Sequence, residues 1–169
     1  MKYRTLPVCL AVVLLGSFVS DSSFAENGST REAKLAKYLS GTRFVGKFTV
    51  DGEDQTPKTE TYTITSCEKL PTKDLYRLKA RIKYGSVDQE VPLDLKILWS
   101  GNTPVITLES IFIPTMGTFD AHVMIRSGKD AGRYAGTWQH GEKGGHLFGK
   151  IVKMDTSETG SVDKNQGDQ

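Results

Sequence analysis

The stretch YRLKARIKYGSVDQEVPLDLKILW, residues 76–99, decides the fold. Its first half alternates apolar residues with Arg or Lys, and its second half alternates apolar with mostly polar residues. A period of two is typical of a strand with one buried and one solvated face. The turn at 85–88 joins the halves, so the stretch predicts an antiparallel hairpin whose apolar sides share one face. We place Asp94 opposite Arg81 in this hairpin, as a cross-strand charge pair.

Similar alternating runs follow on both sides of the hairpin. Turn-forming residues separate them, and the predicted strands are 43–50, 62–66 with Tyr62, Ile64 and Ser66 on one face, 76–84, 91–99, 104–108, 118–126, 133–140 and 146–154. The segment 111–113 leads into Pro114 and Gly117, which indicates a corner or an edge strand. Eight short strands without crossover helices predict an all-β domain over residues 41–154. We expect an antiparallel up-and-down β-barrel, with a two-layer β-sandwich as the alternative.

Residues 26–40 precede this domain and contain the one helix that we expect. Thr30 can cap a helix that runs to Leu39, and Gly41 would end it. Residues 155–169 follow the domain, carry a surplus of acids and lack aromatic residues. That composition predicts a disordered acidic tail.

The start of the chain reads as a secretory signal peptide over residues 1–25. Lys2 and Arg4 precede an apolar run, Leu6–Leu15, and small residues at Ser23 and Ala25 fit a cleavage site after Ala25. The apolar run is shorter than the roughly 20 residues that span a bilayer. We therefore expect a secreted or periplasmic protein with no transmembrane span after cleavage.

Composition limits the partners and the means of stabilisation. The chain has 22 basic and 20 acidic residues, so its near-neutral charge argues against nucleic acid as a partner. Cys67 is the single cysteine after residue 25, which excludes an intramolecular disulfide in the mature chain. The mature length suits one domain with its own hydrophobic core. The predicted sheet must therefore supply the stability.

Glycines and aromatic residues interleave in YAGTWQHGEKGGHLFG, residues 134–149. This segment, together with RIKYG at 81–85 and TPVIT at 103–107, resembles a family of exported bacterial proteins of uncharacterised function, over most of residues 40–153. The Gly-Thr-Trp text at 136–138 is also similar to a strand motif of calycins, the lipocalin and avidin-like barrels that bind small molecules. Calycins carry that motif in the first strand, whereas here it falls in the seventh. The resemblance implies a barrel and transfers no ligand residue.

Three groups of side chains are candidates for a site. Large aromatic residues on the predicted sheet could line a barrel mouth and bind an apolar ligand: Tyr134, Trp138, Trp99 and Tyr84. Imidazole and carboxylate groups around one hairpin turn could form a partial metal site: His140, Glu142 and His146. A row of cations on one strand face could meet an anionic partner: Arg77, Lys79, Arg81 and Lys83.

No local motif of an enzyme is present, neither a nucleophile elbow, nor a phosphate-binding loop, nor a close carboxylate pair. The sequence therefore argues against catalysis and predicts no cofactor. Our leading hypothesis is a non-catalytic envelope module that serves structure or interaction, because bulky inward aromatic residues could fill the barrel. A barrel that binds a small apolar ligand is the alternative, and an enzyme without a local motif is the second alternative. An open, lined cavity would favour ligand binding.

Overall fold

The computed structural model describes residues 23–54 and 56–154. The predicted acidic tail lies outside these residues, and so does nearly all of the predicted signal peptide. One helix is followed by eight strands, which are α1 (Ser23–Leu39), β1 (Thr42–Phe48), β2 (Lys58–Lys69), β3 (Leu75–Tyr84), β4 (Val87–Ser100), β5 (Thr103–Ile113), β6 (Gly117–Arg126), β7 (Gly132–His140) and β8 (Lys143–Lys153).

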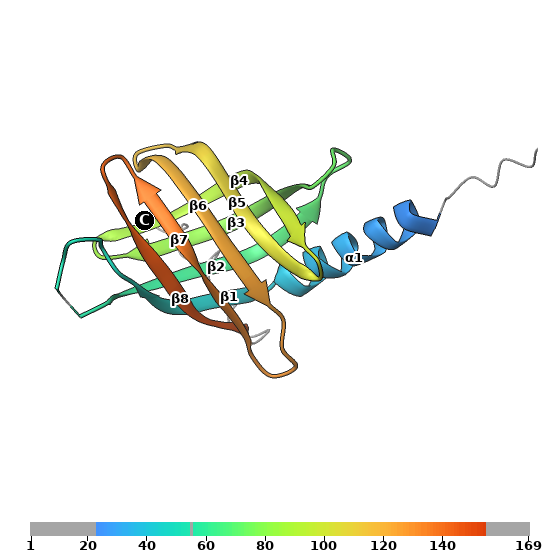
Figure 1. Cartoon of the computed structure of the whole chain (residues 1–169), viewed down its shortest axis with the longest axis horizontal. Helices are drawn as coiled ribbons and strands as arrows, with labels where there is room; N and C mark the ends of the chain where they lie inside the picture. Colours follow the sequence, from blue (N-terminus) through green and yellow to red (C-terminus); the bar gives the residue numbers. More distant parts are fainter. Residues whose placement is uncertain (1–22, 55, 155–169) are drawn as a thin grey trace, which may run out of the picture.

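The strands form a closed barrel in the order in which they occur along the chain, as Figure 1 shows. Each strand is antiparallel to its neighbours, and β8 returns to pair with β1, with Ile151 opposite Phe44. Closure satisfies the backbone donors and acceptors that an open sheet would leave at its edges. The prediction of an up-and-down barrel is confirmed, and the β-sandwich alternative is wrong.

The helix α1 covers one end of the barrel, and its N-terminal half extends away from the strands along the long axis of the molecule (Figure 1). Leu35, Ala36 and Leu39 are buried and belong to the core cluster of the barrel. Glu32 also forms an ion pair of 3.6 Å with Lys69 of β2. The helix begins seven residues before the predicted cap at Thr30, since each residue added to an existing helix gains a hydrogen bond.

The strand β2 differs from its predicted pattern because it contains a bulge. Its register against β3 shifts between Ile64 and Ser66. One extra residue reverses the alternation, so that Ser66 is exposed and Cys67 is buried. The prediction that Ser66 faces inward is therefore wrong.

The hairpin β3–β4 has the predicted buried face but another register. Two residues, Gly85 and Ser86, form its turn, and Gly85 has a φ of +51°. This tight turn sets Asp94 opposite Arg77. The expected Asp94–Arg81 pair is therefore wrong.

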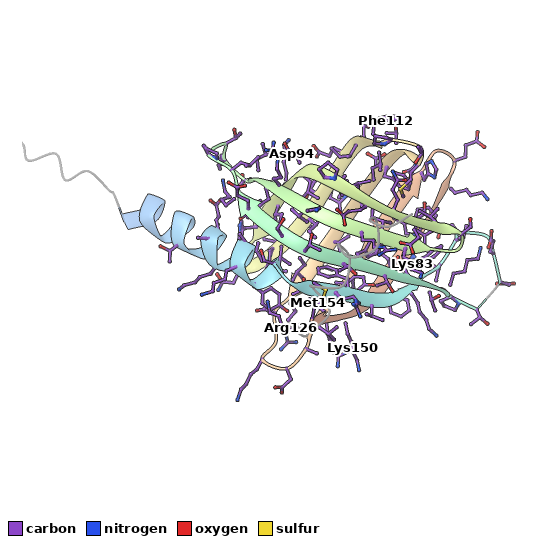
Figure 2. All side chains as sticks on the ribbon, turned by 180° about the vertical axis from the view of Figure 1, so that it is seen from behind. Lys83, Asp94, Phe112, Arg126, Lys150 and Met154 are labelled. Atoms are coloured by element: carbon purple, nitrogen blue, oxygen red, sulfur yellow. The ribbon has the colours of Figure 1, made fainter. Side chains whose placement is uncertain are left out.

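The strand β5 is longer than predicted and runs without a break to Ile113. A bulge between Leu108 and Ile111 keeps it paired with β6. Ile113 is buried, whereas its neighbour Phe112 is 67% exposed and is labelled at the upper margin of Figure 2. The predicted corner at 111–113 is therefore the end of a strand. The strand β8 likewise begins three residues before its predicted start.

Among the described residues, no helix is both long enough and apolar enough to cross a membrane.

Candidate functional site

The barrel encloses an apolar chamber of about 150 Å³. Its lining comes from all eight strands and, apart from Asp120 and the tyrosine hydroxyls, is apolar; it includes Ile64, Leu78, Ala80, Leu95, Ala121 and Val123. A dry apolar cavity of about 150 Å³ is large enough to bind benzene. The chamber can therefore hold one aromatic ring or a short aliphatic chain.

The end of the barrel opposite α1 carries a second, more open cavity of about 610 Å³, which we call the mouth. Ligand pockets in proteins commonly have volumes of about 300–1,000 Å³. The mouth and the chamber share four lining residues, namely Tyr62, Tyr84, Phe119 and Trp138. The two cavities therefore adjoin, and the shared aromatic rings separate the polar rim from the apolar interior.

Aromatic contacts hold the walls of the mouth. The Phe48 ring meets Trp138 edge to face at 5.8 Å and Tyr84 at 6.1 Å. The His140 ring stacks on Phe119 at 4.3 Å. Such geometries are favourable for aromatic pairs. They fix rings from β1, β3, β6 and β7 around a common entrance.

A buried carboxyl group lies where the mouth narrows. Glu60 of β2 is 3% exposed and lines the mouth. Tyr134 donates a hydrogen bond of 2.9 Å to Glu60 Oε1, and Tyr62 donates one of 2.7 Å to Oε2. A carboxylate offers about four acceptor positions, so this one retains capacity for another donor. Among the described residues, no cation forms an ion pair with Glu60.

The contact between Tyr134 and Glu60 crosses two strands, and two glycines make it possible. Glu60 lies opposite Gly46 in β1, Gly46 lies opposite Gly149 in β8, and Gly149 lies opposite Tyr134. A Cβ atom at Gly149 would lie 2.7 Å from Tyr134 Cε1, and one at Gly46 would collide with the Tyr134 hydroxyl. The phenol ring therefore lies flat over bare backbone and reaches the carboxyl group.

Burial controls the protonation of this cluster. Desolvation raises the pKa of Glu60, although the hydrogen bonds from Tyr62 and Tyr134 partly oppose the shift. Desolvation, followed by the charge of Glu60, raises the pKa of both Tyr62 and Tyr134. Both phenols therefore remain hydrogen-bond donors at neutral pH. The Glu60 carboxyl group can accept a hydrogen bond from a molecule in the mouth, and its ionised form can pair with a cationic group of that molecule.

Three of the four predicted ligand residues lie together at this site. Tyr84 and Trp138 line both cavities, and Tyr134 lines the chamber. Trp138 is held by a hydrogen bond of 3.1 Å from Nε1 to the Thr49 carbonyl oxygen. Trp99 lies instead at the end covered by α1, where the Arg31 guanidinium stacks over its ring at 4.4 Å. Tyr84 lies beside the turn of the β3–β4 hairpin and Trp99 near the far end of β4, so the hairpin itself places the two rings at opposite ends of the barrel.

The predicted metal ligands do not form a group. His140 lines the mouth against Phe119, Glu142 lies in the turn between β7 and β8, and His146 is on the exposed side of β8. Among the described residues, no three His, Cys, Asp or Glu side chains are close enough together to hold a metal ion. Side chains of adjacent strands that point to opposite faces of the sheet cannot bind the same metal ion.

The predicted cationic row on β3 is largely paired with acids from β4. Arg77 binds Asp94 at 2.7 Å, Lys79 binds Glu90 at 2.9 Å, and Arg81 binds Asp88 at 2.6 Å. Lys83 is 3.6 Å from Asp88. Three acids thus neutralise most of the charge of four cations. This face offers little uncompensated charge to an anionic partner.

Glu60 is the main residue of the site that the sequence did not indicate, because it lies between the predicted strands 43–50 and 62–66. The alternation of Glu60, Tyr62 and Ile64 was the available signal, since residues two apart in a strand share a face. An acid on an otherwise inward face is a candidate functional residue.

No protein-family model, no curated protein and no solved structure matches this chain. The resemblances to exported bacterial proteins and to calycins therefore stay predictions, and the function has to be argued from the geometry of the site.

Proposed function

We propose that this protein binds a small, largely apolar ligand inside the barrel, outside the cytoplasm. The observation that carries the proposal is the apolar chamber, which adjoins an aromatic mouth. A barrel that served as a filled structural module would place side chains in this volume, because protein interiors are close-packed. The geometry therefore favours the ligand-binding hypothesis over the structural one. The extracytoplasmic location rests on the predicted signal peptide.

The ligand that fits best has an apolar body and one hydrogen-bond donor or cationic group. The body would occupy the chamber, whose lining offers hardly any polar group. The polar group would reach Glu60, which is buried without a cationic partner among the described residues. A buried carboxylate is costly unless it is paired, so a cationic ligand gains from completing the site. The aromatic rings of the mouth also attract cations.

A fluorescence titration with N-phenylnaphthylamine, an uncharged probe that brightens in apolar sites, tests the chamber together with the mouth. Its phenyl ring fits the chamber, and its naphthyl group would lie in the adjoining mouth. We expect saturable binding to one site. Ala121→Phe places a ring into the chamber and should weaken binding roughly tenfold. Ala135→Phe is the matched control, because Ala135 is exposed on β7, and it should leave binding unchanged. Absence of saturable binding, or equal effects of the two variants, would contradict the proposal.

Matched naphthalene compounds test the role of Glu60. Naphthylmethylamine, ethylnaphthalene and naphthoate differ mainly in their charge. At neutral pH the amine should displace the probe at the lowest concentration and naphthoate at the highest. Glu60→Gln should reduce this difference in affinity between the two compounds. If naphthoate competes as well as the amine, Glu60 does not select the ligand, whereas the titration with Ala121→Phe still reports on the chamber.

A further inference from the structure

The outer wall of the barrel over β6, β7, β8 and β1 carries two adjacent rows of outward side chains. In the first row, Arg126 lies opposite Arg133, Arg133 opposite Lys150, and Lys150 opposite Val45. In the second row, Met124 lies opposite Ala135, Ala135 opposite Phe148, and Phe148 opposite Lys47. We call these eight residues the basic wall. They border a surface depression of about 1,090 Å³.

The cations of the basic wall have no partner among the described residues. Lys47, Arg126, Arg133 and Lys150 take part in no ion pair or side-chain hydrogen bond with the described part of the chain. Neither row contains an acid. Like charges directly opposite each other destabilise a sheet, so this arrangement has a cost that an anionic partner would relieve.

On the opposite wall, formed by β3 and β4, a similar row of cations is neutralised by neighbouring acids. There, acids of β4 lie beside the cations of β3, as with Arg77 and Asp94. Figure 2 shows Arg126 and Lys150 at the lower margin of the barrel, far from Asp94 near its upper margin. The outward cations of β3 are therefore neutralised by acids of the neighbouring strand, whereas those of the basic wall are not.

The basic wall also exposes apolar side chains. Val45 is 45% exposed, Met124 54% and Phe148 45%. These are three of the five large apolar residues that are exposed in the described part of the chain. Leu98, a fourth, continues the second row through Val105 of β5. Clustered exposed apolar groups mark an interaction surface.

We infer that the basic wall docks on the surface of an anionic phospholipid membrane. Such a surface offers phosphate groups for the four cations and acyl chains for Phe148, Met124 and Val45. A soluble polyanion would leave the apolar residues uncovered. A second copy of this chain would bring like charges of the two walls together. The inference is independent of the proposed ligand site, which lies inside the barrel.

Sedimentation with sucrose-loaded vesicles tests the docking. One set contains equal amounts of phosphatidylglycerol and phosphatidylcholine, and the other contains phosphatidylcholine alone. We expect the protein to sediment with the anionic vesicles and to remain in solution with the neutral ones. Added salt should weaken the binding, because it screens exposed charges.

Variants locate the contact. Arg133→Gln with Lys150→Gln should lower partitioning about 25-fold, since each cation near an anionic surface contributes about fivefold. Phe148→Ser should also weaken binding to anionic vesicles, although it does not change the net charge of the protein. The matched control, Arg81→Gln with Lys83→Gln on the opposite wall, should change partitioning less than twofold. All these positions are exposed, and circular dichroism would check that each variant folds.

The inference would be overturned if the protein failed to sediment with anionic vesicles, or if the two double variants lost partitioning equally. Retention on heparin without binding to vesicles would also overturn it, because that result would indicate a soluble polyanion as the partner. Self-association that Phe148→Ser abolishes, measured by analytical ultracentrifugation without vesicles, would assign the wall to a second copy. Binding of N-phenylnaphthylamine should be the same in Arg133→Gln/Lys150→Gln as in the natural chain, so failure of the docking and failure of the ligand site are distinguishable.

Discussion

The Tyr134 ring can lie against the inner surface of β1 and β8 because Gly46 and Gly149 carry no side chains. Its hydroxyl thereby reaches Glu60, which is buried and shared with Tyr62. The predicted glycine-aromatic segment is explained by this close approach. The sequence could place Tyr134 near glycines, but the partner across two strands required the structure.

Gly149→Ala should destabilise the fold by about 1–3 kcal/mol, the usual range for inserting a methyl group where there is no room. The new Cβ would lie 2.7 Å from the Tyr134 ring and collide with the Val45 carbonyl. Urea unfolding followed by circular dichroism measures the change. Gly144→Ala in the same strand is the control, because its nearest neighbour would be 3.2 Å away. Equal stability of the two variants would contradict the account.

Glu60→Gln should change how stability depends on pH. The folded-state pKa of Glu60 is raised above its ordinary value of 4.5, so the folded state holds this proton more tightly than the unfolded state does. The natural protein therefore loses stability relative to Glu60→Gln as pH rises from about 4.5 through the raised pKa. Urea unfolding of both proteins across this range gives the difference. A difference that is constant with pH would show that the pKa of Glu60 is not raised.

The strand β2 and the helix α1 both make contacts with residues distant in sequence, and these contacts could not be predicted from the pattern of either element. The bulge in β2 turns Cys67 inward, where it joins the core cluster with Leu39 and Tyr76. The helix α1 attaches to the barrel through its last turns, in which Leu39 is fully buried. Alternation alone locates a strand, but it does not show where one extra residue reverses the faces.

Cys67 should react with Ellman's reagent only after unfolding. Burial raises the pKa of its thiol to about 12, and the thiolate is the reactive form. In a Cys9→Ser background, the thiol should be unreactive in buffer at pH 8 and fully reactive in guanidinium. The matched variant, Cys67→Ser with Ser66→Cys, moves the thiol to the exposed neighbouring position and should react at once. Rapid reaction of Cys67 in the native protein would contradict the inward orientation that the bulge gives to this side chain.

Leu39→Ala should destabilise the barrel by about 2–5 kcal/mol, because it removes a fully buried side chain that joins α1 to the core. Lys37→Ala, an exposed change in the same turn, is the control and should have little effect. Denaturant midpoints of both variants test the expectation. A minor loss for Leu39→Ala would mean that the helix does not close this end of the barrel.

At the scale of the whole molecule, the fold was more accessible to prediction than the site. Each hairpin is local, so alternation and turns were enough to indicate an up-and-down barrel. The site combines Glu60, Tyr134 and Trp138 from strands distant in sequence, and it exists because β8 closes on β1. Which acids neutralise the predicted cationic row on β3 depends on the register of the hairpin, and alternation alone does not set that register.

The central claim is that the interior of the barrel binds an apolar ligand, and methyl-directed NMR tests it most directly. The protein would be labelled at alanine methyl groups and saturated with N-phenylnaphthylamine. We predict nuclear Overhauser effects from the probe to Ala80 and Ala121, which line the chamber, and none to Ala135 on the outer face. Effects confined to Ala135, or no effects at any of these methyl groups, would contradict the claim.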